Sequence, residues 1–153
     1  MIERQIIHDT IVVERSFAVP VTRVFAAFAN IEERKRWDNP GEGWELTELT
    51  QDFRFGGQET SRFGPKGDAR FYSVGVFLEI EPDARIISAG TMHENDKRMT
   101  CTLTSLEFRP EMQGSRLVIT DQSAYFGAEK SQQRRSGWSQ ILDNLERYLA
   151  VKA

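Results

Sequence analysis

A regular stripe of apolar residues marks the C-terminal stretch Ser131–Val151. Polar and charged residues fill the positions between its members. The stripe repeats every three or four residues, the spacing that places side chains on one face of an α-helix. A helix of about 20 residues is roughly 30 Å long, the width of a small domain. We therefore expect a long amphipathic helix that packs on the rest of the chain through Trp138, Ile141, Leu142, Leu145 and Leu149.

The stripe becomes polar toward the N-terminus of this helix, where Arg134 and Ser131 continue it. Two interpretations stay open: the helix extends beyond its partner there, or it covers a partly polar cavity. Gly137 lies beside the stripe, and a glycine within a helix costs about 1 kcal/mol relative to alanine. Such a residue suits a position that a strand or a ligand approaches closely.

Upstream of this helix, most segments alternate apolar and polar residues, the period of a β-strand. The first such segment, Thr10–Ala18, places Ile11, Val13 and Phe17 on one face, with Arg15 in phase with them. Arg15 therefore either points inward, where a buried arginine needs an acidic partner, or lies at a frayed edge.

Two short helices are predicted directly after this strand. Pro20–Phe28 repeats apolar residues at helical spacing and begins with a proline, which suits a first helical turn. Asn30 and Glu33 then resemble a capping box for a second helix that ends near Arg36. The next segment, Trp37–Gly43, contains Asn-Pro-Gly and is predicted to be a loop.

From Trp44 to Tyr125 the chain is expected to consist of strands and turns. The apolar phase slips within Met99–Phe108, which predicts a bulge near Thr104. Together with the first strand these segments indicate an α+β fold, in which a curved antiparallel sheet of about seven strands grips the terminal helix in one domain, residues 1–153. The predicted strands are Trp44–Thr50, Asp52–Arg62, Ala69–Glu81 (with Tyr72, Val74, Val76, Leu78 and Ile80 in one phase), Arg85–His93, Met99–Phe108 and Arg116–Tyr125.

Composition narrows the possible functions. The 153 residues carry a net charge of -3 without a basic tract, which argues against a nucleic-acid partner. The single cysteine, Cys101, excludes an internal disulfide and fits a reducing compartment. Charges interrupt the N-terminus where a signal peptide needs an apolar core, and no apolar run is long enough to span a bilayer. We expect a soluble, cytoplasmic protein.

Residues for metal or cofactor chemistry are sparse. His8 and His93 are the only histidines, and neither belongs to a pair with metal-ligand spacing. The sequence contains no glycine-rich phosphate loop, dinucleotide fingerprint or nucleophile elbow. A catalytic pair of Cys101 with His93 is not favoured, because a small buried core residue is the usual state of a free cysteine. We expect no metal and no cofactor.

Several segments together resemble a known family. They are SFAVPVTRVFAAFAN at 16–30, ERKRWDNP at 33–40, FRFGG at 53–57, GVFLEIEPDARI at 75–86 and GWSQILDNLERYL at 137–149. These segments are similar to the START-like SRPBCC superfamily, also called birch-pollen-allergen-like, and more narrowly to the branch homologous to the activator of heat-shock-protein-90 ATPase. The resemblance implies the helix-grip fold and a cavity between sheet and helix, but no particular substrate. Members often carry a second tryptophan after the one at Trp37, whereas this chain has Asp38.

The predicted site is a cavity under the long helix. Adaptable methionines and flat aromatic rings suit the walls of an apolar pocket, and the alternative is that these side chains simply fill the core. Asp121, if it points inward, either pairs with Arg15 or Arg134 or is an acid that faces a ligand. The predicted cavity residues are Trp37, Trp44, Tyr72, Met92, Met99, Asp121, Tyr125, Phe126, Arg134 and Trp138.

Three functions are compatible with this site. The first is a non-enzymatic protein that binds an apolar or aromatic small molecule. The resemblance implies the second, a co-chaperone-like module with a protein partner. It also implies the third, a cyclase- or dehydratase-type enzyme, which would need Asp121 together with His93 or Tyr72 in one void. Of these we favour small-molecule binding.

Overall fold

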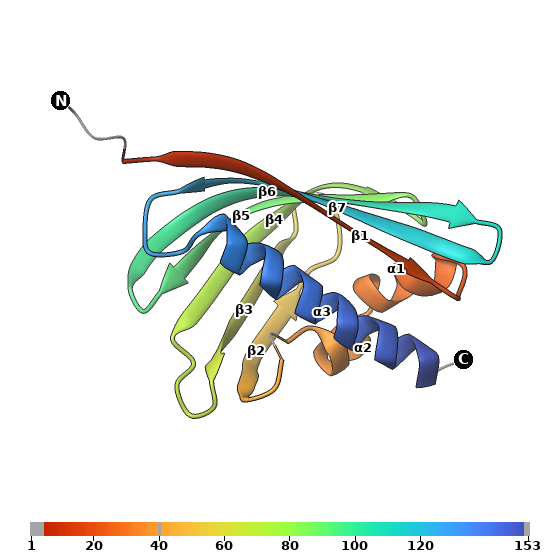
Figure 1. The fold of residues 1–153 in the computed structure, drawn as a ribbon, viewed down its shortest axis with the longest axis horizontal. Helices are drawn as coiled ribbons and strands as arrows, with labels where there is room; N and C mark the ends of the chain where they lie inside the picture. Colours follow the sequence, from red (N-terminus) through yellow and green to blue (C-terminus); the bar gives the residue numbers. More distant parts are fainter. Residues whose placement is uncertain (1–4, 40, 152–153) are drawn as a thin grey trace.

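One curved antiparallel sheet of seven strands wraps around a long helix (Figure 1). The computed structural model describes residues 5–39 and 41–151. Two short helices follow the first strand and lie beside the C-terminal half of the long helix (Figure 1). The predicted α+β helix-grip architecture is confirmed. In chain order the elements are β1 (Ile7–Phe17), α1 (Val21–Ala29), α2 (Ile31–Trp37), β2 (Trp44–Gln51), β3 (Gln58–Pro65), β4 (Phe71–Glu81), β5 (Arg85–Glu94), β6 (Lys97–Glu111), β7 (Gly114–Tyr125) and α3 (Ser131–Val151).

The strands form a meander from β2 to β7, and β1 then pairs with β7. The sheet order is therefore β1-β7-β6-β5-β4-β3-β2. Near the middle, an added Cβ on Gly90 would lie 2.2 Å from the carbonyl oxygen of Val74 on the neighbouring strand. This close approach of two backbones requires glycine and accompanies the bend of the sheet around α3.

The cap predicted for α2 is present. The Oδ1 atom of Asn30 accepts hydrogen bonds from the backbone N–H groups of Glu32 and Glu33, at 2.9 and 3.2 Å. Acidic residues follow in the first turn and basic residues, Arg34 among them, in the last turn, which suits the helix dipole. The helix ends at Trp37, whose indole nitrogen donates to the carbonyl oxygen of Ala27 at 3.2 Å and joins α2 to α1.

The core lies under the C-terminal half of α3. Leu142, Leu145 and Leu149 are at most 2% exposed, as the apolar stripe predicts. They belong to one cluster with side chains from β6, β7, α1 and α2. Within it the ring of Phe28 makes T-shaped contacts with the rings of Trp37 and Phe108, with ring centres 4.7 and 5.6 Å apart. This half of the helix is thus anchored by apolar contacts, which leaves its other half free for another role.

Arg15 points inward and ties β1 to α3. Its two terminal nitrogens lie 2.9 Å from Asp143 and 3.0 Å from Glu146 on the helix. The acidic partners expected for an inward arginine are therefore present, and the frayed-edge interpretation does not hold. Because both acids are about half exposed, we expect these ion pairs to orient α3 more than to stabilise the fold.

The alternating set of residues predicted to face the core from β4, from Tyr72 to Ile80, lies on the outer face of the sheet for most of its length. Val76 and Leu78 are 36% and 45% exposed, whereas Phe77 between them is 3% exposed. An irregularity between Phe77 and Glu79 then returns Ile80 to the core. Alternation identifies the two faces of a strand but does not show which face the helix covers.

The bulge predicted near Thr104 is wrong. β6 pairs with β7 without interruption there, and Thr104 lies opposite Asp121. The register shift on this part of the sheet occurs instead between Met92 and His93, where β5 pairs with β6. The residues of β6 that face inward before Leu106 are threonines, at 100, 102 and 104. Threonine favours the strand conformation, and no apolar side chain is needed where the inner face is not tightly packed.

No helix in the described residues is long and apolar enough to cross a membrane.

Candidate functional site

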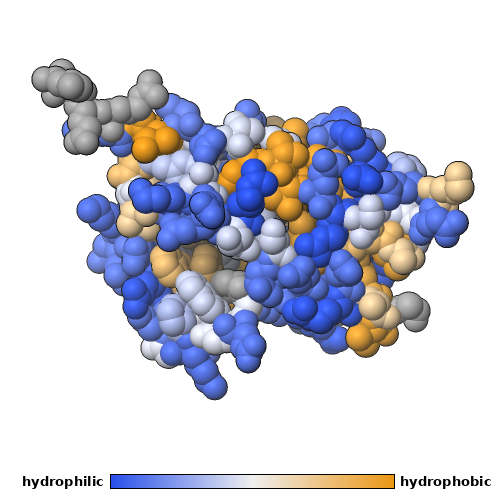
Figure 2. Space-filling view, viewed as in Figure 1, coloured by the Kyte–Doolittle hydropathy of each residue, from blue (hydrophilic) through white to orange (hydrophobic). Residues whose placement is uncertain are grey.

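A pocket of about 900 Å³ lies between the inner face of the sheet and the N-terminal half of α3. Strands β3 to β6 form its floor, α3 its roof, and the segment that joins α2 to β2 one side. Figure 2 shows the surface hollowed between α3 and the strands β2–β4. Arg134 and Gly137 line this pocket, so the polar half of α3 faces a void rather than extending past the sheet.

The roof is open at Gly137. An added Cβ at this position would meet no atom within 4 Å apart from its own helix turn and chain neighbours. The side chains of Gln133, Trp138 and Ile141 surround this gap. Glycine here therefore leaves volume in the pocket, although an alanine would favour the helix.

Asp121 fixes the roof from below. Its side chain is fully buried on β7, and its Oδ2 atom accepts a hydrogen bond from the indole nitrogen of Trp138 at 2.9 Å. Its Oδ1 atom accepts from the hydroxyl of Ser123 at 2.6 Å, and a terminal nitrogen of Arg134 lies 3.5 Å from Oδ2. Both carboxylate oxygens are thus satisfied, and the indole is held in one orientation above the pocket.

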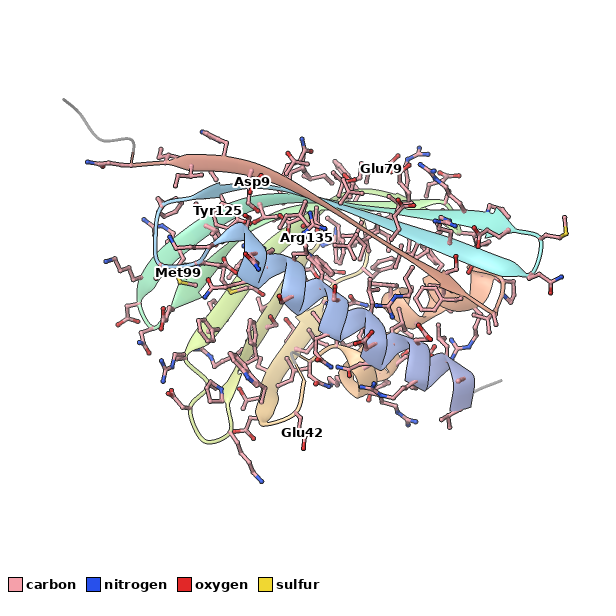
Figure 3. The ribbon with its side chains drawn as sticks, in the orientation of Figure 1. Asp9, Glu42, Glu79, Met99, Tyr125 and Arg135 are labelled. Atoms are coloured by element: carbon pink, nitrogen blue, oxygen red, sulfur yellow. The ribbon has the colours of Figure 1, made fainter. Side chains whose placement is uncertain are left out.

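Arg134 joins three parts of the chain at the start of α3. One terminal nitrogen donates to the hydroxyl of Thr100 on β6 at 2.8 Å and to a carboxylate oxygen of Glu129 at 2.9 Å. The guanidinium carbon lies 5.9 Å from the centre of the Tyr125 ring. Figure 3 shows Tyr125 and Met99 close to this end of the helix. These contacts hold the first turn of α3 against the sheet.

A second charged cluster forms the opposite wall. Arg34 donates from two nitrogens to Oδ2 of Asp38, at 3.1 and 2.5 Å, and from its other terminal nitrogen to Glu59 at 2.9 Å and Gln51 at 2.7 Å. Burial opposes the charged guanidinium, but the charges and hydrogen bonds of Asp38 and Glu59 outweigh it and raise the pKa of Arg34. Gln51 in turn donates to the last carbonyls of α1, so this residue of β2 connects both short helices to the sheet.

Three aromatic rings stand at the open side of the pocket. The three ring centres lie close to one another: Phe71 is 5.7 Å from Trp44 and 5.6 Å from Phe63, nearly parallel to each, and Trp44 is 6.4 Å from Phe63. Trp44 is 38% exposed. Such flat, partly solvated rings offer a stacking surface to an aromatic or apolar molecule.

A model of a known protein family matches most of this chain. The model described as "Activator of Hsp90 ATPase homolog 1-like protein" matches residues 18–150. This chain belongs to that family. The resemblance of the sequence to the branch homologous to the activator of heat-shock-protein-90 ATPase is thereby confirmed.

Solved structures of bacterial proteins agree with this family assignment. The Mll3558 protein of Rhizobium loti is 34% identical, with a TM-score of 0.85 over 95% of this chain and 99% of the other. An uncharacterised protein of Rhizobium leguminosarum is 31% identical, with a TM-score of 0.86 over 95% and 96%. An AHSA1-like protein of Aeromonas hydrophila, 22% identical, shares the fold with a TM-score of 0.74 over 94% of each chain. Comparison with curated proteins gives no match.

The predicted site residues of this chain divide into two groups. Six line the pocket: Trp37, Trp44, Met92, Met99, Arg134 and Trp138. Four do not. Asp121 and Tyr125 are buried on the inner face beneath the start of α3, behind the residues that line the void. Phe126 follows β7 and is 41% exposed.

Tyr72, the remaining predicted residue, lies on the outer face of the sheet. Its neighbours Phe71 and Ser73 line the pocket, so alternation turns Tyr72 away from it. Its ring contacts the guanidinium of Arg62 at 4.5 Å and the ring of His93 at 5.9 Å. Asp121 therefore shares a void with neither His93 nor Tyr72, and the acid–base pair required for the enzyme alternative is not assembled.

Sequence reasoning missed the Arg34 cluster. Arg34 and Asp38 are one helical turn apart, a spacing that predicts an ion pair but not its burial. Glu59 comes from another strand, and no local pattern connects it to α2. A further local signal is Asp38 itself, which stands where the resemblance of the sequence implies a second tryptophan.

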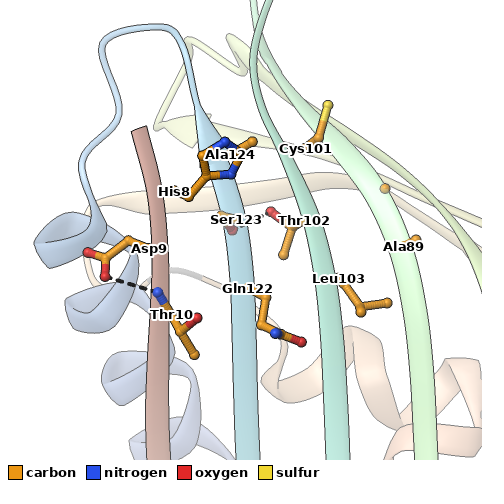
Figure 4. Close-up of a pocket in the computed structure, with 11 residues that line it drawn as sticks. His8, Asp9, Thr10, Ala89, Cys101, Thr102, Leu103, Gln122, Ser123 and Ala124 are labelled. Atoms are coloured by element: carbon orange, nitrogen blue, oxygen red, sulfur yellow. Dashed lines mark hydrogen bonds between the residues drawn. The ribbon is translucent and has the colours of Figure 1, made fainter. Parts of the chain in front are cut away.

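A second hollow, of about 550 Å³, lies on the outer face of the sheet (Figure 4). Its lining includes His8 and Cys101, but Ala124 on β7 lies between them in register, so two strand spacings, roughly 10 Å, separate them. Cys101 is exposed, and the expectation of a buried core cysteine is wrong, because the apolar phase of β6 at this level faces outward. In the described residues no three His, Cys, Asp or Glu side chains are placed to hold a metal ion.

The buried tyrosine under α3 predicts how stability depends on pH. Burial raises the pKa of the Tyr125 hydroxyl above its ordinary value of 10.0, Arg134 opposes this and Asp121 adds to it. The folded state therefore keeps this proton to a higher pH than the unfolded state, so stability falls as the pH rises above about 10. We expect melting temperatures to fall between pH 10 and the folded pKa, and less steeply in Tyr125→Phe. The outer-face variant Tyr72→Phe is the control, and an equal flattening by both would contradict the assignment.

Proposed function

We propose that this protein binds a small molecule with an apolar or aromatic body in the pocket under α3. The observation that carries the proposal is Gly137, which leaves open volume in the roof of a pocket of about 900 Å³. That volume falls in the range typical of ligand pockets in proteins, roughly 300–1,000 Å³. Aromatic rings at the mouth and a few fixed polar groups on the walls also suit such a ligand.

The rigidity of both walls supports a preformed site. Trp138 is held by Asp121, and Arg34 by two carboxylates and an amide, so neither wall has to reorganise when a ligand enters. Preorganised walls lower the entropic cost of binding. We propose binding without a bond-making step.

Filling the roof tests this proposal. Gly137→Leu is expected to place a side chain in the void and to abolish the rise in melting temperature that apolar ligands give the parent protein, a rise that follows from mass action. The control Gln132→Leu adds the same side chain at an exposed position of α3 outside the pocket. If a broad panel of aromatic and aliphatic compounds shifts the melting temperature of neither the parent nor the control, the proposal fails.

A smaller substitution at the same position is expected to stabilise the protein. Gly137→Ala removes a helix-interior glycine where a Cβ meets no atom within 4 Å, so we expect a gain of about 1 kcal/mol in the free energy of unfolding. Denaturant unfolding measures the change. A loss of stability would mean that the roof is already filled.

A second candidate is a co-chaperone-like role, favoured by the description of the family model, which names the activator of Hsp90 ATPase. The outer face of the sheet presents partly exposed apolar side chains, among them Val12, Leu78 and Leu103, that a protein partner could cover. The test is whether the purified protein stimulates the ATPase of an Hsp90-type chaperone. The cytoplasmic location expected from the sequence, like the single-domain boundaries, stays a prediction.

A further inference from the structure

The charges that line the pocket are unbalanced. Two arginines, Arg34 and Arg134, face four carboxylates, so the lining of the described residues carries an excess of two negative charges. Of the four, Glu94 has one ion-pair partner among residues 5–39 and 41–151, Arg70, which lies outside the pocket at 3.6 Å. The others are Asp38, Glu59 and Glu129. An anionic ligand would enter against this excess, whereas a cationic one would reduce it.

One wall offers carboxylate oxygens that Arg34 does not use. Both hydrogen bonds from Arg34 to Asp38 end on Oδ2, and the hydrogen bond to Glu59 ends on Oε1. Within residues 5–39 and 41–151, no donor reaches Oδ1 of Asp38 or Oε2 of Glu59. A carboxylate has acceptor capacity for several hydrogen bonds, so each keeps room for another cation.

The floor leaves the free oxygen of Glu59 uncovered. Oε2 lies 3.4 Å from the position that a Cβ of Gly75 would occupy, and Gly75 has no side chain there. Both residues line the pocket. Glycine on β4 therefore gives an incoming group access to the carboxylate from inside the void.

The rest of the floor suits an elongated molecule. From Glu59, the inner phase of β3 continues through Ser61 to Phe63, and four residues of strand span roughly 13 Å. Ser61 pairs with Ser73 on β4 at 2.6 Å, and Phe63 stacks on Phe71 beyond them. The floor thus runs from a carboxylate past two hydroxyls to aromatic rings.

We infer that the ligand is an amine: a flat apolar or aromatic body that carries one ammonium group, with the ammonium on Glu59 and Asp38 and the body along Ser61 toward Trp44, Phe63 and Phe71. This inference rests on the proposed function and names the chemical class of its ligand. An ammonium supplies donors to the two free oxygens and keeps the walls hydrogen-bonded. The aromatic rings attract its apolar body and also tolerate a cation at their faces.

Three fluorescent probes with the same body test the charge. Pyrenemethylamine is cationic at neutral pH, pyrenemethanol is neutral and pyrenecarboxylic acid is anionic. Titration of each with the full chain, followed by fluorescence anisotropy, is expected to give the amine an affinity roughly tenfold above that of the alcohol, with the acid weakest. Glu59→Gln should remove the advantage of the amine over the alcohol, because the amide keeps the shape and the acceptor for Arg34 but not the negative charge.

Matched variants separate the pocket from the overall charge. Glu32→Gln removes the same charge from the exposed face of α2 and is expected to leave the preference intact. Asp38→Asn repeats the test if Glu59→Gln does not fold, as judged by circular dichroism. Binding of the alcohol as tight as that of the amine, or tighter binding of the acid, overturns the inference while the proposed function stands. If no probe binds to the parent chain, both are overturned.

Discussion

Arg34→Ala is expected to destabilise the protein by about 3–5 kcal/mol, the cost of breaking a buried ion pair on one side. Arg34 is the shared partner of Asp38 and Glu59 and also binds Gln51, so its loss leaves two carboxylates and an amide oxygen without their donor in a poorly solvated wall. Like charges close together add to the cost. Equilibrium unfolding in urea measures the difference from the parent protein.

Two further variants make this prediction specific. Arg36→Ala removes an exposed arginine from the same helix and is expected to change the free energy of unfolding by less than about 0.5 kcal/mol. Adding Glu59→Gln to Arg34→Ala should recover part of the loss, because it removes one of the two orphaned charges. Equal effects of Arg34→Ala and Arg36→Ala would mean that solvent screens the cluster. The role of these carboxylates in the pocket would then need revision.

Asp121→Ala is expected to cost about 3 kcal/mol, chiefly because the indole N–H of Trp138 loses its acceptor and a fully buried site is left partly empty. Arg134 keeps Thr100 and Glu129, so its guanidinium is not orphaned. The same variant should broaden or shift the fluorescence of Trp138, since the indole is no longer fixed above the pocket. Thermal and urea unfolding give the stability, and tryptophan emission gives the orientation.

Asp121→Asn separates the acceptor from the charge. The amide oxygen can still accept from Trp138, and the amide nitrogen can donate to Ser123, whose hydroxyl also meets that of Thr102 at 2.7 Å and is free to turn. We therefore expect roughly half the loss of Asp121→Ala. If asparagine proves as damaging as alanine, the negative charge toward Arg134 matters more than the hydrogen bond to the indole.

The pocket lies under the N-terminal half of α3 and the core under its C-terminal half. The two regions differ because the sheet residues that face the helix change from polar to apolar. Where the inner phases of β6 and β7 are apolar, as at Leu106 and Leu117, α3 packs tightly with leucines. Where the inner phase of β6 becomes Thr100, Thr102 and Thr104, α3 carries Arg134 and Gly137 and the layers separate around a void. Stability is supplied by the first half, which allows the second to remain open.

The sequence by itself determined the architecture, because hydrophobic periodicity and caps act over a few residues. The stripe from Trp138 to Leu149, the cap at Asn30 and the alternation of the strands are local patterns, and each produced the element expected. Six of the predicted pocket residues also lie on its walls, since the polar turn of α3 and the tryptophans beside the loop were visible in the chain.

Only the tertiary structure decided which face of each strand lines the pocket and which charges meet there. Tyr72 was placed on the wrong face of the sheet because alternation separates the two faces of a strand without showing which of them is buried. That is decided by the side on which α3 covers the sheet. Arg34 and Glu59 are brought together because α2 packs on β2, the neighbour of β3, although 25 positions of sequence separate the two residues. Such pairings depend on long-range contacts, and no local pattern in either segment encodes them.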